Sequence, residues 1–397
     1  MRLKKIGLLP KLLFGMLIGI LAGSFGTLFH MENHFLFTGV VRLFSTFTAL
    51  FSTFLSFLIP LLIVSFVAVG LAVLGKKANK LFAVTLLLAY SSTVIAGFSS
   101  FFIGKAILPS IVSKITGSSV EGKDFTAFFT ISAEPVFGVM TALVLAFLLG
   151  LGLANTNGKT LLAVLCDLQE IIKLTLNKVI IPLIPVHIAG MFCNIAASGE
   201  LLPTIRIFLK LYVLIVAFQL IYIGIQFFAA SLVNKENKFK LLPNIFPAYF
   251  TALGTQSSAS AIPVSLTCAK KNGIPEDIAD FVIPLGATIH LAGDTICLVI
   301  GAMGILLANG ITPTLSMFVP YIFMLGVTMV AAPGIPGGGV MAALGLLSSL
   351  LGFTDPMQQL MISLHLAQDS FGTACNVAGD QAISMLIHRY DKKTAKK

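Results

Sequence analysis

Charged residues are scarce in this sequence of 397 residues. Lys and Arg number 26 and Asp and Glu 16, so that 11% of the residues are charged, against about 25% in ordinary soluble domains. Hydrophobic residues make up 57% of the chain, and its mean hydropathy is +0.98. Because so few charges cannot cover a water-facing surface, the composition excludes soluble enzymes, nucleic-acid-binding proteins and disordered chains. It predicts an all-α polytopic membrane protein.

Cys-x-x-Cys pairs are also missing. The five cysteines lie in or beside apolar stretches, and we interpret them as reduced and structural. The net charge of +10 comes mostly from short basic clusters between apolar stretches, which are typical of cytoplasmic loops and not of a nucleic-acid-binding surface. They place both termini in the cytoplasm, and the expected location is the plasma membrane, which the chain would cross several times. The clusters begin at Arg2, Lys76, Lys235, Lys270 and Arg389.

Long apolar stretches predict eight transmembrane helices. About 20 apolar residues are needed to cross the lipid bilayer, and several stretches exceed this length, so tilted or kinked helices are expected. Pro60 and Pro185 are candidate kink sites. An even number of spans agrees with both termini on one side of the membrane. The predicted spans are 10–30, 38–72, 82–113, 125–155, 160–198, 201–233, 278–308 and 356–388.

Two further stretches, 241–270 and 313–352, are interpreted as re-entrant helical hairpins. The first is interrupted by a serine-rich segment at 254–260 and the second by a Gly/Pro-rich segment at 331–339. Interrupted helices at membrane depth are tolerated where they line a cavity or lie within protein. The alternative is a pair of ordinary loops, but both arms of the first stretch are too short to cross. Two hairpin tips near the midplane are typical of the binding site of a secondary transporter.

The last predicted span carries a polar stripe on one helix face. Its members are spaced by 4, 4, 3 and 4 residues: His365, Asp369, Thr373, Asn376 and Asp380. Such a stripe can join neighbouring helices through hydrogen bonds. We favour a functional interpretation, because a carboxylate inside the membrane is costly and carboxylate, hydroxyl and amide oxygens suit a cation.

The seventh predicted span repeats the four-residue spacing with Gly286, His290 and Asp294. The histidine and the aspartate lie one turn apart, so they can share a proton or a cation. A structural hydrogen bond between them explains the pattern equally well.

At these residues the chain resembles the dicarboxylate/amino acid:cation symporters, the glutamate-transporter family. Four motifs carry the resemblance, in order and in the expected elements, and it is strongest over 241–390. They are QSSASAIPV at 256–264, GATIHLAGD at 286–294 for the family's GATINMDGT, GIPGGG at 334–339, and DSFGTACNVAGD at 369–380 for the family's D-x-x-R-T-x-x-N-V-x-G-D.

The resemblance implies a homotrimer and an elevator mechanism with two hairpin gates. Residues 1–81 and 125–200 would form the scaffold, with spans one, two, four and five. Residues 82–124 and 201–397 would form the moving transport domain, with the other spans and both hairpins.

The resemblance also implies roles for individual residues. Asp369 would hold the ammonium group of an amino acid, and Asn376 its α-carboxylate, together with the first hairpin tip. The remaining substrate-binding positions are Ser257, Ser258, Asp294, Ile335, Pro336, Gly337, Gly338, Gly339, Gly372 and Thr373. The cation site, for Na+ or H+, would comprise Gly286, His290, Asn376 and Asp380. No cofactor other than the coupling ion is expected.

Departures from the family's motifs bear on the substrate. Gly372 and Gln256 replace two arginine positions that can pair with an acidic side chain. Asp294 replaces a threonine that faces the substrate, and His290 and Ala292 replace an asparagine and an aspartate of a sodium site. These changes predict symport of a small amino acid, neutral or with a cationic side chain, with one coupling ion missing or replaced by a proton. The alternative is a symporter of acidic amino acids or C4-dicarboxylates.

Two other classes of protein share part of the pattern. Ala-Gly-Asp occurs at 292–294 and 378–380, and intramembrane aspartyl proteases use two aspartates in spans. Neither aspartate has the Gly-x-Gly prefix of those proteases, so the expected protein is a transporter and not an enzyme. An anion-conducting channel is the third alternative, which saturable counterflow in liposomes would separate from a carrier.

Overall fold

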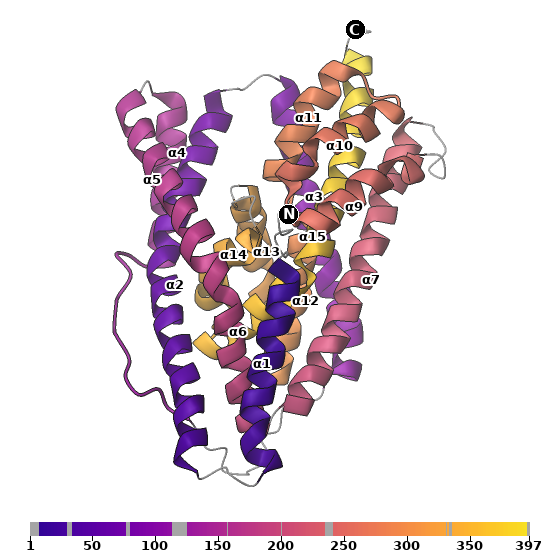
Figure 1. The fold of residues 1–397 in the computed structure, drawn as a ribbon. Helices are drawn as coiled ribbons and strands as arrows, with labels where there is room; N and C mark the ends of the chain where they lie inside the picture. The colour runs from indigo at the N-terminus through magenta and orange to yellow at the C-terminus, as the bar shows by residue number, and fades with distance from the viewer. Residues whose placement is uncertain are drawn as a thin grey trace, which may run out of the picture.

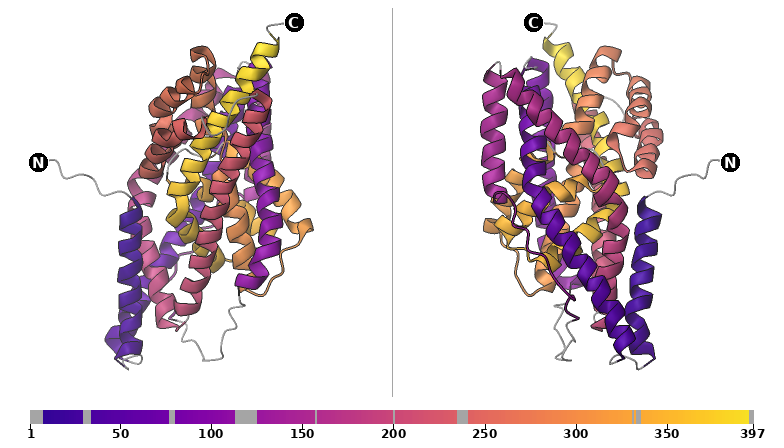
Figure 2. Two further views of the ribbon diagram at one scale, coloured as in Figure 1. Left: turned by 90° about the vertical axis from the view of Figure 1, so that its right-hand side faces the viewer. Right: turned by 60° about the vertical axis from the view of Figure 1, so that its left-hand side comes forward.

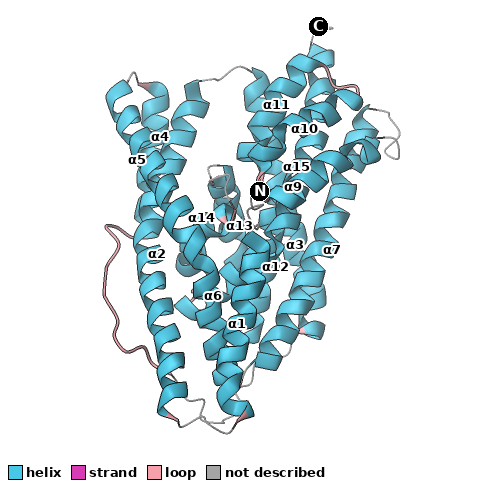
Figure 3. Cartoon of the chain, in the orientation of Figure 1, coloured by secondary structure: helices cyan, strands magenta, loops and turns pink. Residues whose placement is uncertain are grey.

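The computed structural model describes residues 8–29, 34–76, 80–112, 125–156, 158–199, 201–234, 241–330, 332 and 336–394. Every regular element among them is helical (Figure 3), and no strand occurs in this part of the chain. The predicted all-α architecture is therefore confirmed.

Long helices account for most of the chain (Figure 1). They are α1 (Leu8–Leu28), α2 (Phe35–Lys76), α3 (Lys80–Ile111), α4 (Val139–Asn155), α5 (Lys159–Thr175), α6 (Ile181–Ala197), α7 (Leu201–Asn234) and α15 (Asp355–Thr394). Five helical stretches of the described residues are long and apolar enough to cross a membrane: Phe35–Ala72, Lys80–Ile111, Lys159–Ala197, Leu201–Val233 and Glu276–Ala308. The count of eight spans stays a prediction.

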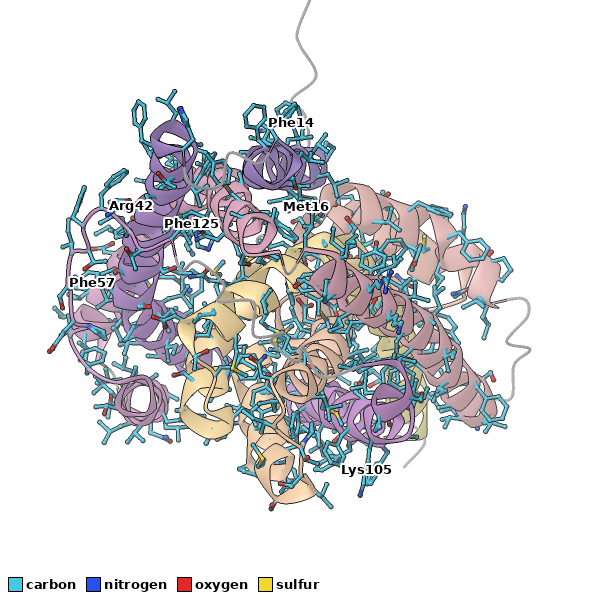
Figure 4. All side chains as sticks on the ribbon, turned by 90° about the horizontal axis from the view of Figure 1, so that it is seen from below. Phe14, Met16, Arg42, Phe57, Lys105 and Phe125 are labelled. Atoms are coloured by element: carbon cyan, nitrogen blue, oxygen red, sulfur yellow. The ribbon has the colours of Figure 1, made fainter. Side chains whose placement is uncertain are left out.

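The outer surface of the bundle is apolar. Phe14 on α1 is 64% exposed and Leu148 on α4 is 67% exposed. Seen from below, Phe14 points away from the bundle while Lys105 lies at its edge on α3 (Figure 4). Large apolar side chains on an outer surface fit contact with lipid.

The predicted span 125–155 is shorter than expected. Helix α4 begins at Val139, and residues 125–138 form an extended segment along α2 (Figure 1). Arg42 on α2 fixes this segment, because its Nε donates to the Thr126 carbonyl over 3.1 Å and its guanidinium lies 4.5 Å from the ring centre of Phe128. Pro135 and Gly138 in the segment disfavour a helix.

Helix α1 packs closely on α6. Gly15, Gly19 and Gly23, four residues apart, face the α6 backbone, where a Cβ would collide with the carbonyls of Pro185, Ala189 and Cys193. Small residues at this spacing allow close helix contact in membranes. Between α5 and α6 the helical run continues through a π-helical turn, η1 (Leu176–Ile180), which ends just before the prolines of α6.

The first predicted hairpin is present as two short helices. A 3-10 turn, η2 (Leu242–Ile245), leads into α9 (Phe246–Thr255), and α10 (Ser258–Lys271) returns. At 1.5 Å per residue, neither arm approaches the ~30 Å of a bilayer core. The tip turns at Gln256, which has a φ of 52°, and Ser257 caps α10 by accepting from the Ser260 amide over 3.3 Å.

The second predicted hairpin is also present. Its arms are α13 (Leu315–Val330) and α14 (Gly338–Leu351). Gly337 enters α14 with a φ of 75°, a conformation that glycine adopts without strain. Residues 331 and 333–335 of the tip, including Ile335, lie outside the described residues.

The seventh predicted span is not continuous, contrary to expectation. It consists of α11 (Glu276–Ile289) and α12 (Ala292–Ala308), separated at His290 and Leu291. Side chains from other helices bond to the backbone beside the break. The Gly293 amide donates to Asn376 over 2.7 Å, and the Gly293 carbonyl accepts from Gln219 over 2.9 Å. Such replacement bonds allow an interrupted helix at membrane depth.

Helix α15 runs through one half of the molecule (Figure 2). It contacts α7, α9, α10, α11, α12 and α14, while α2 contacts α4, α5, α6 and also α14. Both hairpins and the break in the seventh span therefore face a single helix, the one that carries the polar stripe.

Candidate functional site

All five members of the predicted stripe on α15 are buried. Their exposed fractions range from 0% for His365 to 6% for Thr373. Three of them, Asp369, Thr373 and Asn376, line a small cavity where the tip of the first hairpin, the broken helix and the second hairpin meet α15. The cavity is lined by Gln256, Ser258, Ala287, Leu291, Asp294, Ala332, Gly339, Asp369, Thr373 and Asn376.

Asp369 is joined to the tip of the second hairpin. Its Oδ2 accepts from the Gly337 amide over 2.9 Å, and the Thr373 hydroxyl lies 3.5 Å from its Oδ1. The amide belongs to the N-terminal end of α14, where backbone N–H groups are free to meet an anion. The hairpin and the α15 carboxylate are thus held together in this structure.

Asp294 lies in the first turn of α12 and is 3% exposed. Its Oδ1 is 2.9 Å from Nε2 of His365, and its Oδ2 accepts from the Asn376 amide over 2.6 Å. Because the Gly293 amide donates to Oδ1 of Asn376, the side-chain amide of Asn376 is oriented with its N–H groups toward Asp294. Gly339 packs against the carboxylate, since a Cβ there would lie 2.5 Å from Oδ1.

The predicted cation site forms a second polar group. Nδ1 of His290 lies 3.1 Å from Oδ1 of Asp380. A Cβ on Gly286 would lie 2.6 Å from the same oxygen, and Gly379 allows the imidazole to approach α15. Asn376 is one turn away but directs its amide toward Asp294 and Gly293. It would have to change partners to bind an ion here.

Sequence reasoning missed the residues that complete this group. Nε2 of His290 lies 3.0 Å from the Ser92 hydroxyl on α3. From α7, Gln226 donates to the Ser92 hydroxyl over 2.9 Å, and the Tyr222 hydroxyl donates to the Ser92 carbonyl over 2.6 Å. A short polar run at 91–93 within an apolar span was the only signal available.

Of the other predicted substrate-binding residues, some line the cavity and others do not. Ser258 lines the cavity, whereas Ser257 is a partly buried helix cap. Pro336 and Gly338 lie at the start of α14. Gly372 is buried outside the cavity lining, and a Cβ on it would meet side-chain amides of Gln368 and Gln219 at 3.3–3.5 Å. Gly372, which stands at an arginine position of the family, is therefore bordered by two glutamines that sequence reasoning also missed.

These glutamines form a buried pair. Nε2 of Gln219 on α7 donates to Oε1 of Gln368 over 2.6 Å and to the Gly293 carbonyl. Through the bond to the Gly293 carbonyl, the pair supports the break in the seventh span.

The sequence profile of the sodium:dicarboxylate symporter family matches residues 8–390. Human excitatory amino acid transporter 2 is 27% identical over 254 residues, which cover 62% of this chain and 44% of that protein. An excitatory amino acid transporter of Caenorhabditis elegans is 24% identical over 270 residues, 66% of this chain and 53% of the relative. Mouse neutral amino acid transporter B(0) is 27% identical over 164 residues, which cover 41% of this chain and 30% of that protein.

The chain thus spans about half the length, or less, of these relatives. The family match nevertheless extends over nearly the whole chain and confirms the resemblance seen in the four motifs. It also removes the protease alternative, since the family consists of transporters and not of enzymes. The chain belongs to the sodium:dicarboxylate symporter family.

Proposed function

We propose that this protein is a secondary transporter that couples Na+ or H+ to the uptake of a small amino acid lacking a side-chain carboxylate. The observation that carries this proposal is the cavity against α15. It lies at two hairpin tips and contains two buried carboxylates, Asp294 and Asp369. Neither carboxylate has an ion pair with a described Lys or Arg.

The polar groups of the cavity fit an amino acid. Asp369 would accept the ammonium group in a charge-assisted hydrogen bond. The α-carboxylate would meet the N-terminal end of α10 at Ser258 and the N–H bond of the Asn376 amide that does not donate to Asp294. A second carboxylate on the substrate would find no cationic partner among the described lining residues, so acidic amino acids and C4-dicarboxylates are disfavoured.

The group around Asp380 would bind the coupling ion. Na+ suits the carboxylate together with backbone carbonyls near Gly286 and His290. A proton shared by His290 and Asp380 is the alternative. We propose Na+ coupling, in agreement with the family to which the chain belongs.

The arrangement of the helices supports an elevator mechanism. In Figure 1, α2, α4 and α5 lie at one side of the molecule, and α3, α7, α9 to α11 and α15 lie at the other. We propose that residues 1–81 and 125–200 form the scaffold of a homotrimer in the plasma membrane. Residues 82–124 and 201–397 would then move as the transport domain.

Uptake into liposomes tests this function. The full chain is reconstituted, and uptake of alanine, serine and lysine is measured under a sodium gradient, a pH gradient or neither. Uptake that is saturable, shows counterflow and requires the sodium gradient is expected. Uptake driven only by the pH gradient would assign the proton as the coupling ion, and no uptake under any gradient would contradict the proposal.

Competition experiments test the exclusion of acidic substrates. A second carboxylate would be buried without a cationic partner, which costs several kcal/mol. Aspartate, glutamate, malate and succinate are expected to bind at least ~100-fold more weakly than the best amino acid without a side-chain carboxylate. Micromolar binding of aspartate or succinate would favour the acidic alternative instead.

A further inference from the structure

Two carboxylates share the cavity at close range. Asp294, His365 and Asp369 each offer a ligand atom, and these atoms lie within 4.8 Å of one another. Both carboxylates line the cavity, whereas His365 lies behind Asp294 on α15 and is fully buried. A transported molecule bound at Asp369 therefore lies next to Asp294 as well.

His365 is the only described side chain near enough to form an ion pair with Asp294, and only its protonated form would carry the opposite charge. The hydrogen-bond partners of Asp294 are the Asn376 amide and the imidazole of His365. The N-terminal end of α12 adds a partial positive charge of about half an elementary charge. No described Lys or Arg forms an ion pair with it. A buried carboxylate without a full opposite charge is costly.

Counting charges distinguishes two kinds of amino acid. With an uncharged side chain bound, Asp294, Asp369 and the α-carboxylate make three anions, against the α-ammonium and, at most, His365. A second ammonium or a guanidinium on the substrate supplies the missing positive charge. One carboxylate oxygen of Asp294 lies within 4.8 Å of one of Asp369. When the ammonium group of the substrate is bound at Asp369, its side chain can therefore reach Asp294.

We propose that Asp294 forms a subsite for a cationic side chain, which makes basic amino acids the preferred substrates. This inference rests on the proposed function and narrows it. The Asn376 and His365 contacts act as positioning contacts, because they fix the orientation of the Asp294 carboxylate. Gly339 packs against this carboxylate, and a larger residue there would press on Oδ1 of Asp294.

A divalent metal ion is a weaker match to the same residues. Asn376 already donates to Oδ2 of Asp294, so one of the carboxylate oxygens is occupied in this structure. His365 also directs Nε2 at Asp294 itself. The metal is therefore kept as an outcome of the experiment.

Matched pairs of ligands test the subsite. Binding to the purified full chain is measured by calorimetry for lysine against norleucine, ornithine against norvaline, and 2,4-diaminobutyrate against 2-aminobutyrate, with Na+ present. Within each pair the main difference is the terminal ammonium. The cationic member is expected to bind at least ~10-fold more tightly, as a charge-assisted hydrogen bond provides.

Variants assign the effect to Asp294. Asp294→Asn keeps the size of the side chain and is expected to remove most of the difference within each pair. Glu170→Gln makes the same chemical change at an exposed position on α5 and should preserve the difference. If Asp294→Asn does not fold, Asp294→Thr is used, and the ligand pairs on the unmodified chain remain decisive.

The outcomes separate this inference from the proposed function. Equal binding within the pairs, or tighter binding of norvaline and norleucine, would overturn the cationic subsite and leave amino-acid transport intact. Binding of Zn2+ or Mn2+ that depends on Asp294, without binding of any amino acid, would overturn both. Loss of all amino-acid binding in Asp369→Asn, with the preference intact in the unmodified chain, is the result expected if both hold.

Discussion

Asp380 has an environment suited to an ion-binding carboxylate. It is 1% exposed, and its Oδ1 contacts His290 beside the break between α11 and α12. A carboxylate at this depth costs at least ~2.5–3.5 kcal/mol on insertion scales unless it is compensated. A cation or a proton at this position would provide that compensation.

Asp380→Asn should therefore abolish ion-driven uptake without unfolding the protein. The amide keeps the shape of the side chain but loses the charge that offsets dehydration of the cation. Uptake into liposomes is measured over a range of Na+ concentrations and pH values, and folding by size exclusion. Asp167→Asn, on the exposed surface of α5, is the control. Unchanged uptake and ion dependence in Asp380→Asn would show that the ion binds elsewhere.

Gly286 offers a steric test of the same site. A methyl group on Gly286 would lie 2.6 Å from Oδ1 of Asp380, so the carboxylate would have to move. Gly286→Ala is expected to raise the Na+ concentration needed for half-maximal uptake by ~10-fold or more, about 1.4 kcal/mol. Gly224→Ala on α7 has nothing within 4 Å of its new methyl group and should behave as the unmodified chain. Equal ion dependence in both variants would contradict the site.

Residues on one helix face could be predicted from the sequence, and residues that meet across helices could not. The four-residue spacing of the α15 stripe fixed a common direction for Asp369 and Asp380. The contacts of His290 with Ser92 depend on how α3 packs, and the two residues are 198 positions apart. The spacing of residues along the sequence cannot predict such a contact.

At the scale of single elements, the tip of the second hairpin joins backbone conformation to the site. Gly337 has a φ of 75°, and its amide donates to Asp369. A side chain at this φ is strained by roughly 1–2 kcal/mol. Gly352, at the other end of α14, has a φ of 68° and nothing near its would-be Cβ. These two glycines share a conformation and differ in their distance from the cavity.

Gly337→Ala and Gly352→Ala should therefore both lower stability through backbone strain, but they should differ in function. Strain at Gly337 would shift the amide away from Asp369, and a methyl group there would also press on Leu366. We expect Gly337→Ala to weaken amino-acid binding by ~10-fold or more and Gly352→Ala to leave it nearly unchanged. Thermal unfolding measures the effect on stability, and ligand titration measures the effect on binding. Equal amino-acid binding by the two variants would show that the hairpin tip does not contribute to the binding site.

The elements themselves were predictable to different degrees. Both hairpins followed from tips rich in Ser, Gly or Pro, and the first also from arms too short to cross. The break at His290 was not predicted, because the apolar pattern of 278–308 continues through it and the bonds that allow it come from Gln219 and Asn376. Residues 125–138 contain enough apolar side chains to resemble part of a span, but they lie extended along α2.

For the molecule as a whole, motion requires that the proposed scaffold and transport domain separate. A hydrogen bond between them is found near the start of α15, where Gln359 donates to the Ser52 hydroxyl on α2 over 2.9 Å. Both residues also line a small polar depression between α2, α14 and α15. A contact of this kind can break and re-form as one group of helices slides past the other.

Cross-linking across this contact should stop transport. Cysteines replace Ser52 and Gln359 in a Cys166→Ser background, since the other four native cysteines are buried. A short bifunctional thiosulfonate that joins positions 52 and 359 is expected to reduce uptake in proportion to the cross-linked fraction, and reduction should restore it. The control pair replaces Asn244 and Asn272, which bond over 2.7 Å within the first hairpin and would move together. Full uptake by a chain cross-linked between 52 and 359 would show that α2 and α15 keep their relative positions during transport, and the division into scaffold and transport domain would then be wrong.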